Sequence, residues 1–104
     1  MDLQQLRCFV VTAEELHFGR AAQKLGMAPA ALGRHIKLLE EELATRLIDR
    51  TTRSVSLTAD GAILLDRARS LLDDAAGLES LFRASGRKPS VTLRLGSITA
   101  RQWV

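Results

Sequence analysis

The chain has 104 residues, of which 46% are hydrophobic and 26% are charged. This balance is typical of one folded domain with extensions and excludes an intrinsically disordered chain. No apolar run is long enough to cross a membrane, no signal or lipidation motif is present, and the single cysteine excludes an intrachain disulfide. We therefore expect a cytoplasmic protein that does not associate with membranes.

The net charge of +3 is unevenly distributed along the sequence. Residues 1–58 carry a net charge of +1, residues 59–85 carry −2 and residues 86–104 carry +4. Because the excess positive charge lies mainly near the C-terminus, bulk charge does not by itself indicate a nucleic-acid partner. Only the positions of individual basic side chains can indicate nucleic-acid binding in this chain.

An apolar stripe with helical spacing predicts a first helix over residues 3–16. The stripe consists of Leu3, Leu6, Phe9, Val10, Ala13 and Leu16. Cys8 lies within the apolar segment LRCFVV. That setting is typical of a buried, unreactive thiol.

Residues 17–36, HFGRAAQKLGMAPAALGRHI, predict two short helices joined by a tight turn. The first helix covers residues 18–25 and ends at Gly26, because glycine adopts the left-handed conformation without a steric penalty. Pro29 suits the first turn of the next helix, which we expect over residues 29–45. The segment therefore predicts a helix-turn-helix, whose second helix can enter a DNA major groove.

Two short alternating segments follow, around Leu47-Ile48 and over residues 55–57, with a polar turn between them. This pattern predicts a small β-hairpin, and a hairpin in this place is a wing. Residues 1–58 are thus expected to form a mainly α, winged helix-turn-helix DNA-binding domain, with its helix-turn-helix at about residues 18–37.

A long helix is predicted over residues 59–85, with Thr58 as its N-cap and Asp60 in its first turn. At about 1.5 Å per residue, such a helix is longer than a three-helix head can cover. Part of its apolar stripe should therefore be exposed and pair with a second copy of the chain. The residues predicted for this dimer interface are Leu64, Leu65, Ala68, Leu71, Leu72, Ala75, Leu78 and Phe82.

Residues 86–104 have a different pattern from the helices that precede them. The segment 85–90 has the composition of a linker, and residues 91–96 alternate like a strand that has no partner in the remainder. We expect a hinge and the first strand of a truncated second domain.

Three segments together resemble the N-terminal region of LysR-type transcriptional regulators. They are DLQQLRCFVVTAEE, FGRAAQKLG and ALGRHIKLLEEELATRLIDRTTRSVSLTADG. The resemblance implies a winged helix-turn-helix that dimerises through the long helix and reads a palindromic operator on double-stranded DNA. It also implies that VTLRLGSITA begins an effector-binding domain, that the full-length protein is a tetramer, and that this protein responds to a small inducer. No cofactor is expected in residues 1–104 themselves.

Arg34 is the leading candidate for contact with DNA. Leu32 and Ile36 are expected to point inward, which turns Gly33, Arg34 and Lys37 toward solvent. A guanidinium there can bind guanine O6 and N7 or a phosphate, and the family places a DNA-contacting arginine at this position.

The N-terminal turn of the recognition helix departs from the family pattern. The family commonly has Ser-Gln-Pro at positions 28–30 and Ser or Thr at position 33, where this chain has Ala28-Pro29-Ala30 and Gly33. Pro29 and Ala30 can contact a thymine methyl group but cannot hydrogen-bond a base edge. We therefore predict weaker direct base readout, with more specificity resting on Arg34, the wing and DNA shape.

Further candidates for DNA contact lie before and after this helix. Gly19 stands where the family often has a Ser or Thr that caps the second helix, and its N–H can serve a phosphate. Arg50 stands at the wing tip, where an arginine is favoured in a narrow minor groove, and its alternative role is an ion pair with Asp49 or Glu42. The remaining candidates are His35 on the recognition helix and Thr51, Thr52 and Arg53 at the wing tip. We also expect the run from Glu40 to Glu42 to offer salt bridges to arginines such as Arg46.

The sequence is also compatible with two alternatives to a LysR-type DNA-binding domain. One is a helical dimerisation module that no longer reads DNA, and the other is the winged-helix head of a molybdate-dependent regulator. An enzyme is not expected, because no nucleophile–base arrangement or Gly-rich phosphate loop is present. His17 and His35 lack companions at ligand spacing, so no metal site is predicted.

Overall fold

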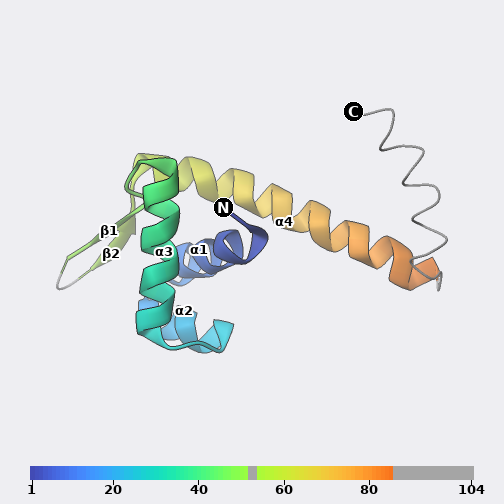
Figure 1. Cartoon of the computed structure of the whole chain (residues 1–104), viewed down its shortest axis with the longest axis horizontal. Helices are drawn as coiled ribbons and strands as arrows, with labels where there is room; N and C mark the ends of the chain where they lie inside the picture. The colour runs from blue at the N-terminus through green and yellow to red at the C-terminus, as the bar shows by residue number, and fades with distance from the viewer. Residues whose placement is uncertain (52–53, 86–104) are drawn as a thin grey trace. The chain divides into compact units, whose positions relative to one another are not determined.

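A computed structural model describes residues 1–51 and 54–85 of the chain, so the predicted hinge and strand after residue 85 lie outside the described residues. The elements in order are α1 (Leu3–Glu15), α2 (Phe18–Leu25), α3 (Pro29–Leu43), β1 (Ile48–Arg50), β2 (Val55–Leu57) and α4 (Ala59–Ser85) (Figure 1). The predicted mainly α class is confirmed. The chain divides into two compact units, of which the first is Met1–Leu72 and the second begins at Asp73.

Helix α1 begins with a capping box. The Asp2 carboxylate accepts the Gln5 backbone N–H at 2.7 Å, and the Gln5 side chain accepts the Asp2 N–H at 3.2 Å. The helix ends one residue earlier than predicted, because Leu16 adopts a left-handed conformation with φ 50°. Its N–H donates to the Thr12 carbonyl, which closes the last turn.

The core of the first unit lies between α1, α2 and α3, with the start of the hairpin and residues 64–72 of α4 packed against it. Cys8 is buried there as predicted, and burial raises the pKa of its thiol, which disfavours the reactive thiolate. Thr12 is buried beside it and donates to the Cys8 carbonyl at 2.7 Å. The buried hydrophobic residues are Leu6, Cys8, Phe9, Val10, Ala13, Ala21, Ala22, Leu32, Ile36, Leu39, Leu47, Ile48 and Ala68.

The turn between α2 and α3 has the conformation that its sequence predicts. Gly26 adopts φ 68°, and its N–H donates to the carbonyls of the last turn of α2. Ala28 gives α3 no side-chain cap, and Pro29 occupies the first turn. The helix ends at Leu43, two residues earlier than predicted, because Ala44 adopts the left-handed conformation with φ 55°.

The predicted hairpin is present as a two-stranded antiparallel sheet that projects beside α3 (Figure 1). Its register pairs Ile48 with Leu57 and Arg50 with Val55. Ile48 anchors the base of the hairpin, because its side chain is buried in the core. The tip residues 52–53 lie outside the described residues.

Thr58 joins the hairpin to α4 through both of its polar groups. Its hydroxyl accepts the Gly61 N–H at 3.0 Å, as expected of an N-cap, and donates to the Arg46 carbonyl at 2.6 Å. Its backbone N–H donates to the Leu47 carbonyl at 3.0 Å.

Within the described ranges 1–51 and 54–85, no helix combines the length and apolar character needed to cross a membrane.

Ion pairs join the end of α1 to α2 and predict an acid-sensitive contribution to stability. Lys24 Nζ lies 2.5 Å from the Glu15 carboxylate, and Arg20 Nε lies 3.4 Å from it. The hydrogen bond from Lys24 is the main reason that the pKa of Glu15 is below its ordinary value of 4.5. A carboxyl with a lowered folded-state pKa stabilises the fold above its unfolded pKa and loses that contribution as pH falls through the folded value.

We therefore expect Glu15→Gln to lower the urea midpoint of unfolding near pH 7. The difference from wild type should shrink as pH falls below the ordinary pKa of a glutamate carboxyl, because Glu15 then becomes protonated first in the unfolded state and, at lower pH, in the folded state. Unfolding curves between pH 7 and pH 3 measure this, with Lys24→Gln and the double variant included to isolate the pair. A difference in urea midpoint between wild type and Glu15→Gln that stays constant across this pH range would contradict the prediction.

Candidate DNA-binding surface

The outer face of α3 carries the side chains that the sequence predicts to be available for DNA. Arg34, Lys37, Pro29 and Ala30 are exposed, whereas Leu32, Ile36 and Leu39 are fully buried on the opposite face. Gly33 and His35 are half-buried at the edges of this surface. Among the described residues, neither Arg34 nor Lys37 has an ion-pair partner. Both cations are therefore available to an external acceptor.

The N-terminal turn of α3 presents backbone and carbon atoms rather than polar side chains. Ala28, Pro29 and Ala30 are all exposed, and none has a side-chain hydrogen-bonding group. A Cβ added at Gly33 would lie 3.8 Å from Arg50 Nη1, an ordinary contact distance, so alanine would fit there. This surface can contact methyl groups closely but has little capacity to read hydrogen-bond patterns.

The cap of α2 is not at Gly19, as the sequence suggested, but at His17. His17 Nδ1 accepts the Arg20 N–H at 3.0 Å, and Gly19 lies inside the helix. A Cβ on Gly19 would lie 3.0 Å from His17 Cε1, so the absence of a side chain gives the imidazole room to fold over the helix end. Histidine is an uncommon N-cap, which is why the sequence pattern did not reveal it.

Arg50 pairs with neither of the carboxylates considered for it. Its guanidinium carbon lies 4.5 Å from the centroid of the Phe18 ring. Asp49 instead lies 3.8 Å from Arg46, and Glu42 pairs with the N-terminal ammonium of Met1. The guanidinium of Arg50 is therefore held against α2 and α3.

Thr51, which directly follows β1, has a structural role in the hairpin turn. Its hydroxyl oxygen accepts the Ser54 N–H at 3.0 Å, and its own N–H donates to the Ser54 carbonyl at 2.9 Å. These bonds close the turn that leads to the tip. Arg53 and Thr52, the other predicted wing contacts, lie outside the described residues.

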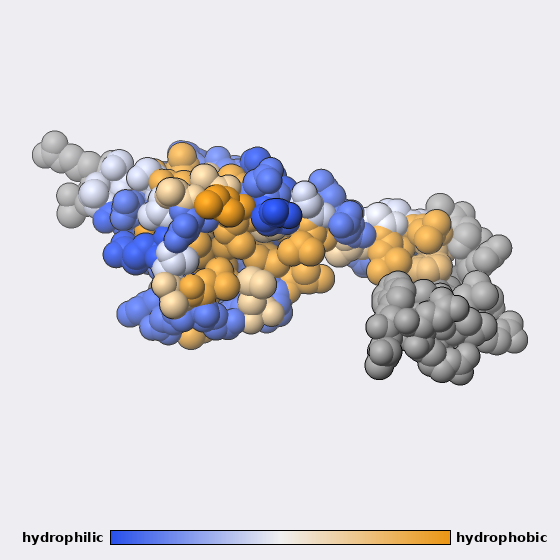
Figure 2. Space-filling view, turned by 90° about the horizontal axis from the view of Figure 1, so that it is seen from above, coloured by the Kyte–Doolittle hydropathy of each residue, from blue (hydrophilic) through white to orange (hydrophobic). Residues whose placement is uncertain are grey.

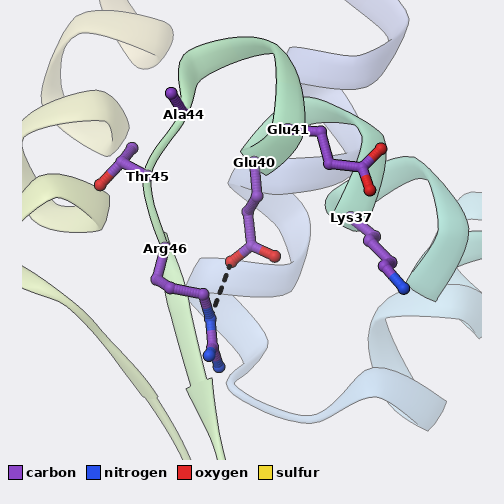
Figure 3. A pocket seen from close by; sticks show the side chains of 6 residues that line it. All are labelled: Lys37, Glu40, Glu41, Ala44, Thr45 and Arg46. Carbon is purple, nitrogen blue, oxygen red and sulfur yellow. Dashed lines mark ion pairs between the residues drawn. The ribbon is translucent and has the colours of Figure 1, made fainter.

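Glu40 fixes the start of β1 to α3, a role that the sequence did not reveal. Its carboxylate accepts the N–H groups of Leu47 at 2.8 Å and Ile48 at 3.2 Å. The expected pairing with Arg46 is also present, at 3.8 Å (Figure 3). These groups border a shallow pocket of about 340 Å³ that is lined by Lys37, Glu40, Glu41, Ala44, Thr45 and Arg46.

Glu40→Ala is expected to lower the free energy of unfolding by about 2 kcal/mol, because two backbone N–H groups beside buried residues would lose their acceptor. Glu41→Ala, one position along the same helix, is the matched control, since Glu41 is exposed and no described cation pairs with it. Urea unfolding of both variants measures the difference. Equal stabilities for the two variants would contradict the role assigned to Glu40.

The predicted dimer stripe on α4 divides into two parts. Ala68 is fully buried, and Leu64, Leu65 and Leu72 pack against the core of the first unit. These four side chains therefore serve the head itself rather than only a partner. Ala75 and Phe82 are half-buried. Hydrophobic side chains also show at the surface of α4 in Figure 2, and the most exposed are Ile63 at 64%, Leu71 at 48%, Leu78 at 59% and Leu81 at 62%.

No three His, Cys, Asp or Glu side chains among the described residues lie together as a metal site would require. His17 caps α2, and His35 lies on α3. The chemistry that this surface offers is hydrogen bonding and charge, supplied mainly by Arg34, Lys37 and Arg50.

Three packed helices, a glycine-containing turn and a two-stranded wing define a winged helix-turn-helix DNA-binding domain. Residues 3–62 match the family described as bacterial regulatory helix-turn-helix protein, lysR family. The chain belongs to the LysR family of transcriptional regulators. This assignment favours the resemblance noted in the sequence over the molybdate-dependent alternative.

Curated relatives of the chain are bacterial transcriptional regulators. The HTH-type transcriptional regulator TtuA of Agrobacterium vitis is 57% identical over 98 residues, covering 94% of this chain and 32% of the relative. The HTH-type transcriptional regulator XapR of Escherichia coli K12 is 43% identical over 102 residues, covering 98% of this chain and 35% of the relative. The chain thus spans about one third of the length of these relatives.

Solved structures with the same fold include two DNA complexes. The BenM_DBD/catB site 1 DNA complex is 36% identical, with a TM-score of 0.79 and coverage of 85% of this chain and 98% of that chain. The CbnR_DBD-DNA complex is 32% identical, with a TM-score of 0.77 and coverage of 84% and 100%. The described fold is therefore that of domains that have been solved bound to DNA.

Proposed function

We propose that this chain is the part of a LysR-type regulator that recognises a palindromic operator as a homodimer. In this proposal α3 lies in the major groove of each half-site, and the hairpin reaches the adjacent minor groove. The observation that carries it is the pair of exposed cations, Arg34 and Lys37, on the outer face of α3 with no partner among the described residues. Membership of the family supports the same conclusion.

Arg34 is proposed as the main reader of base identity. A guanidinium can bind O6 and N7 of guanine together, and such a pair discriminates against the wrong base by about 1–3 kcal/mol. Lys37, with a single flexible ammonium group, is better suited to a phosphate. The apolar turn formed by Ala28, Pro29 and Ala30 would add contacts with thymine methyl groups.

Homodimerisation is proposed through α4. Ile63, Leu71, Leu78 and Leu81 expose apolar surface that the described chain does not cover. A two-fold dimer presents two recognition helices to the two halves of a palindrome, so dimerisation and operator symmetry support each other. The full-length protein, by its family, would form a tetramer and bind a small inducer in its effector domain.

Binding to DNA tests this proposal directly. An operator duplex is first selected from a randomised pool by the 104-residue chain, and its affinity is compared with that of a scrambled duplex by fluorescence anisotropy at several salt concentrations. We expect tighter binding to the selected duplex at every concentration. Equal binding to both duplexes, with only a salt-dependent term, would contradict sequence-specific recognition. No binding even at low salt would favour the helical dimerisation module.

A further inference from the structure

We propose that Arg50 binds a DNA phosphate beside the recognition helix and that Phe18 is the positioning residue for its guanidinium. This proposal rests on the DNA-binding function proposed above. It changes the expected location of Arg50, which the sequence places at the wing tip and the minor groove. Three features of Arg50 support this role, namely its aromatic contact, its place next to Gly33 and its lack of a counter-ion among the described residues.

The aromatic contact holds the guanidinium without using its hydrogen-bond donors. Arg50 Cζ lies 4.5 Å from the centroid of the Phe18 ring, within the range of a cation–π contact. A guanidinium donates its hydrogen bonds at its edges, in its own plane. Stacking on a ring therefore fixes the group while leaving edge donors free, which reduces the entropy lost when it binds an oxygen.

Because Gly33 has no side chain, the Arg50 guanidinium can lie beside α3 at this position. A Cβ on Gly33 would lie 3.8 Å from Arg50 Nη1, which places this nitrogen where a longer side chain from α3 would extend. Gly33 belongs to the face of α3 that includes Arg34 and Lys37, the face proposed to meet DNA. Arg50 therefore supplies a cation beside a position of the recognition helix that has no side chain.

Arg50 also differs from several other arginines in the described residues. Arg20 pairs with Glu15, Arg46 pairs with Glu40 and Asp49, and Arg69 pairs with Glu14. No hydrogen bond or ion pair joins the Arg50 side chain to another described residue. An arginine held in place but without a local carboxylate is suited to an external anion.

A phosphate is the acceptor that this position favours. The pairing with Val55 fixes Arg50 as the last residue of β1, and its guanidinium lies over Phe18 of α2 and beside Gly33 of α3. A helix lying in the major groove is flanked by the two phosphate backbones, and groups beside such a helix bind them more often than base edges. The contact would thus fix the position of α3 on the duplex.

The salt dependence of DNA binding tests the role of Arg50. Arg50→Gln is expected to weaken binding about tenfold on both the selected and the scrambled duplex, because a charged hydrogen bond is lost. It should also reduce the slope of log K against log salt by about 0.9 for each protomer bound. Arg46→Gln is the matched control for charge and should leave the slope unchanged, since Arg46 is already neutralised by Glu40 and Asp49.

A double-mutant cycle tests the role of Phe18. Phe18→Leu keeps an apolar side chain but removes the ring, and it should weaken binding about threefold in the wild type and not at all in the Arg50→Gln background. Phe18→Tyr retains the ring and should restore wild-type binding. A purely structural role for Phe18 would instead reduce binding by the same factor in both backgrounds, and this would overturn the positioning role.

Two other outcomes would overturn the phosphate contact. One is an unchanged slope for Arg50→Gln, and the other is a loss confined to the selected duplex, which would indicate a base contact. The Arg34→Ala variant shows whether such an outcome concerns only the Arg50 contact or also the proposed DNA-binding function. If wild type prefers its operator and Arg34→Ala does not, the DNA-binding function stands whatever Arg50→Gln shows.

Discussion

Replacing Gly61 with alanine should lower the free energy of unfolding by about 3 kcal/mol, a cost typical of severe overpacking. A Cβ at this position would lie 2.1 Å from the Leu47 carbonyl oxygen and 3.2 Å from Leu57 Cδ2. The oxygen belongs to the backbone and also accepts the Thr58 N–H. It cannot rotate away as a side chain could, so the junction between hairpin and α4 would have to open.

Gly77→Ala is the matched control for this prediction. Gly77 lies in the same helix, but a Cβ there would meet nothing within 4 Å. Alanine should therefore stabilise the helix by about 0.5–1 kcal/mol through its higher helix propensity. Urea unfolding of the two variants gives both values. A Gly61→Ala variant as stable as Gly77→Ala would contradict the close approach of Gly61 to the Leu47 carbonyl oxygen.

The second large effect is expected at the exposed apolar residues near the end of α4. Leu78 and Leu81 expose 59% and 62% of their surface and lie three residues apart, on one face of the helix. If this face forms the dimer, the double variant Leu78→Asp, Leu81→Asp should raise the dimer dissociation constant at least about 100-fold, because each leucine contributes twice across a two-fold axis. Sedimentation equilibrium over a range of concentrations measures the constant.

Ala76→Asp is the control for the added charge. Ala76 is exposed and precedes Leu78 by two residues, which at about 100° per residue turns it away from the Leu78 face. The dissociation constant of this variant should remain close to that of wild type. Dimers that persist in the Leu78→Asp, Leu81→Asp variant would place the interface elsewhere on the chain.

Local sequence patterns were sufficient to predict the helices and the hairpin. The apolar spacing in residues 3–43 identifies the buried faces, and Gly26 and Pro29 mark the turn between α2 and α3. The ends of α1 and α3 were placed one and two residues too late. Leu16 and Ala44 adopt the left-handed conformation that ends a helix, although neither residue type favours it.

Contacts between distant residues could not be predicted from spacing. Glu40 accepts two N–H groups from the start of β1, and Arg50 lies over Phe18 on another element. Both depend on how the hairpin packs against the helices, which no local pattern encodes. The same limit explains why Ala68 was included among the predicted dimer residues, although it is buried in the core of its own unit.

The departures at positions 28–33 make Arg34 the centre of the functional account. Ala28, Pro29, Ala30 and Gly33 offer no side-chain donor or acceptor, so α3 has few groups that distinguish one base pair from another. Arg50, in the role inferred for it, would strengthen binding to any duplex without adding sequence preference. Discrimination on the major-groove side would thus depend mainly on one guanidinium in each half-site.

The preference of Arg34→Ala for the selected operator over scrambled DNA is therefore the most direct test, with Arg46→Ala as a control for lost charge. We expect the ratio of the two affinities to fall by about 30-fold or more in Arg34→Ala, since one bidentate contact disappears from each half-site. Arg46→Ala should retain the preference, because its charge is already paired with Glu40 and Asp49. An Arg34→Ala variant that discriminates as well as wild type would contradict recognition through the outer face of α3.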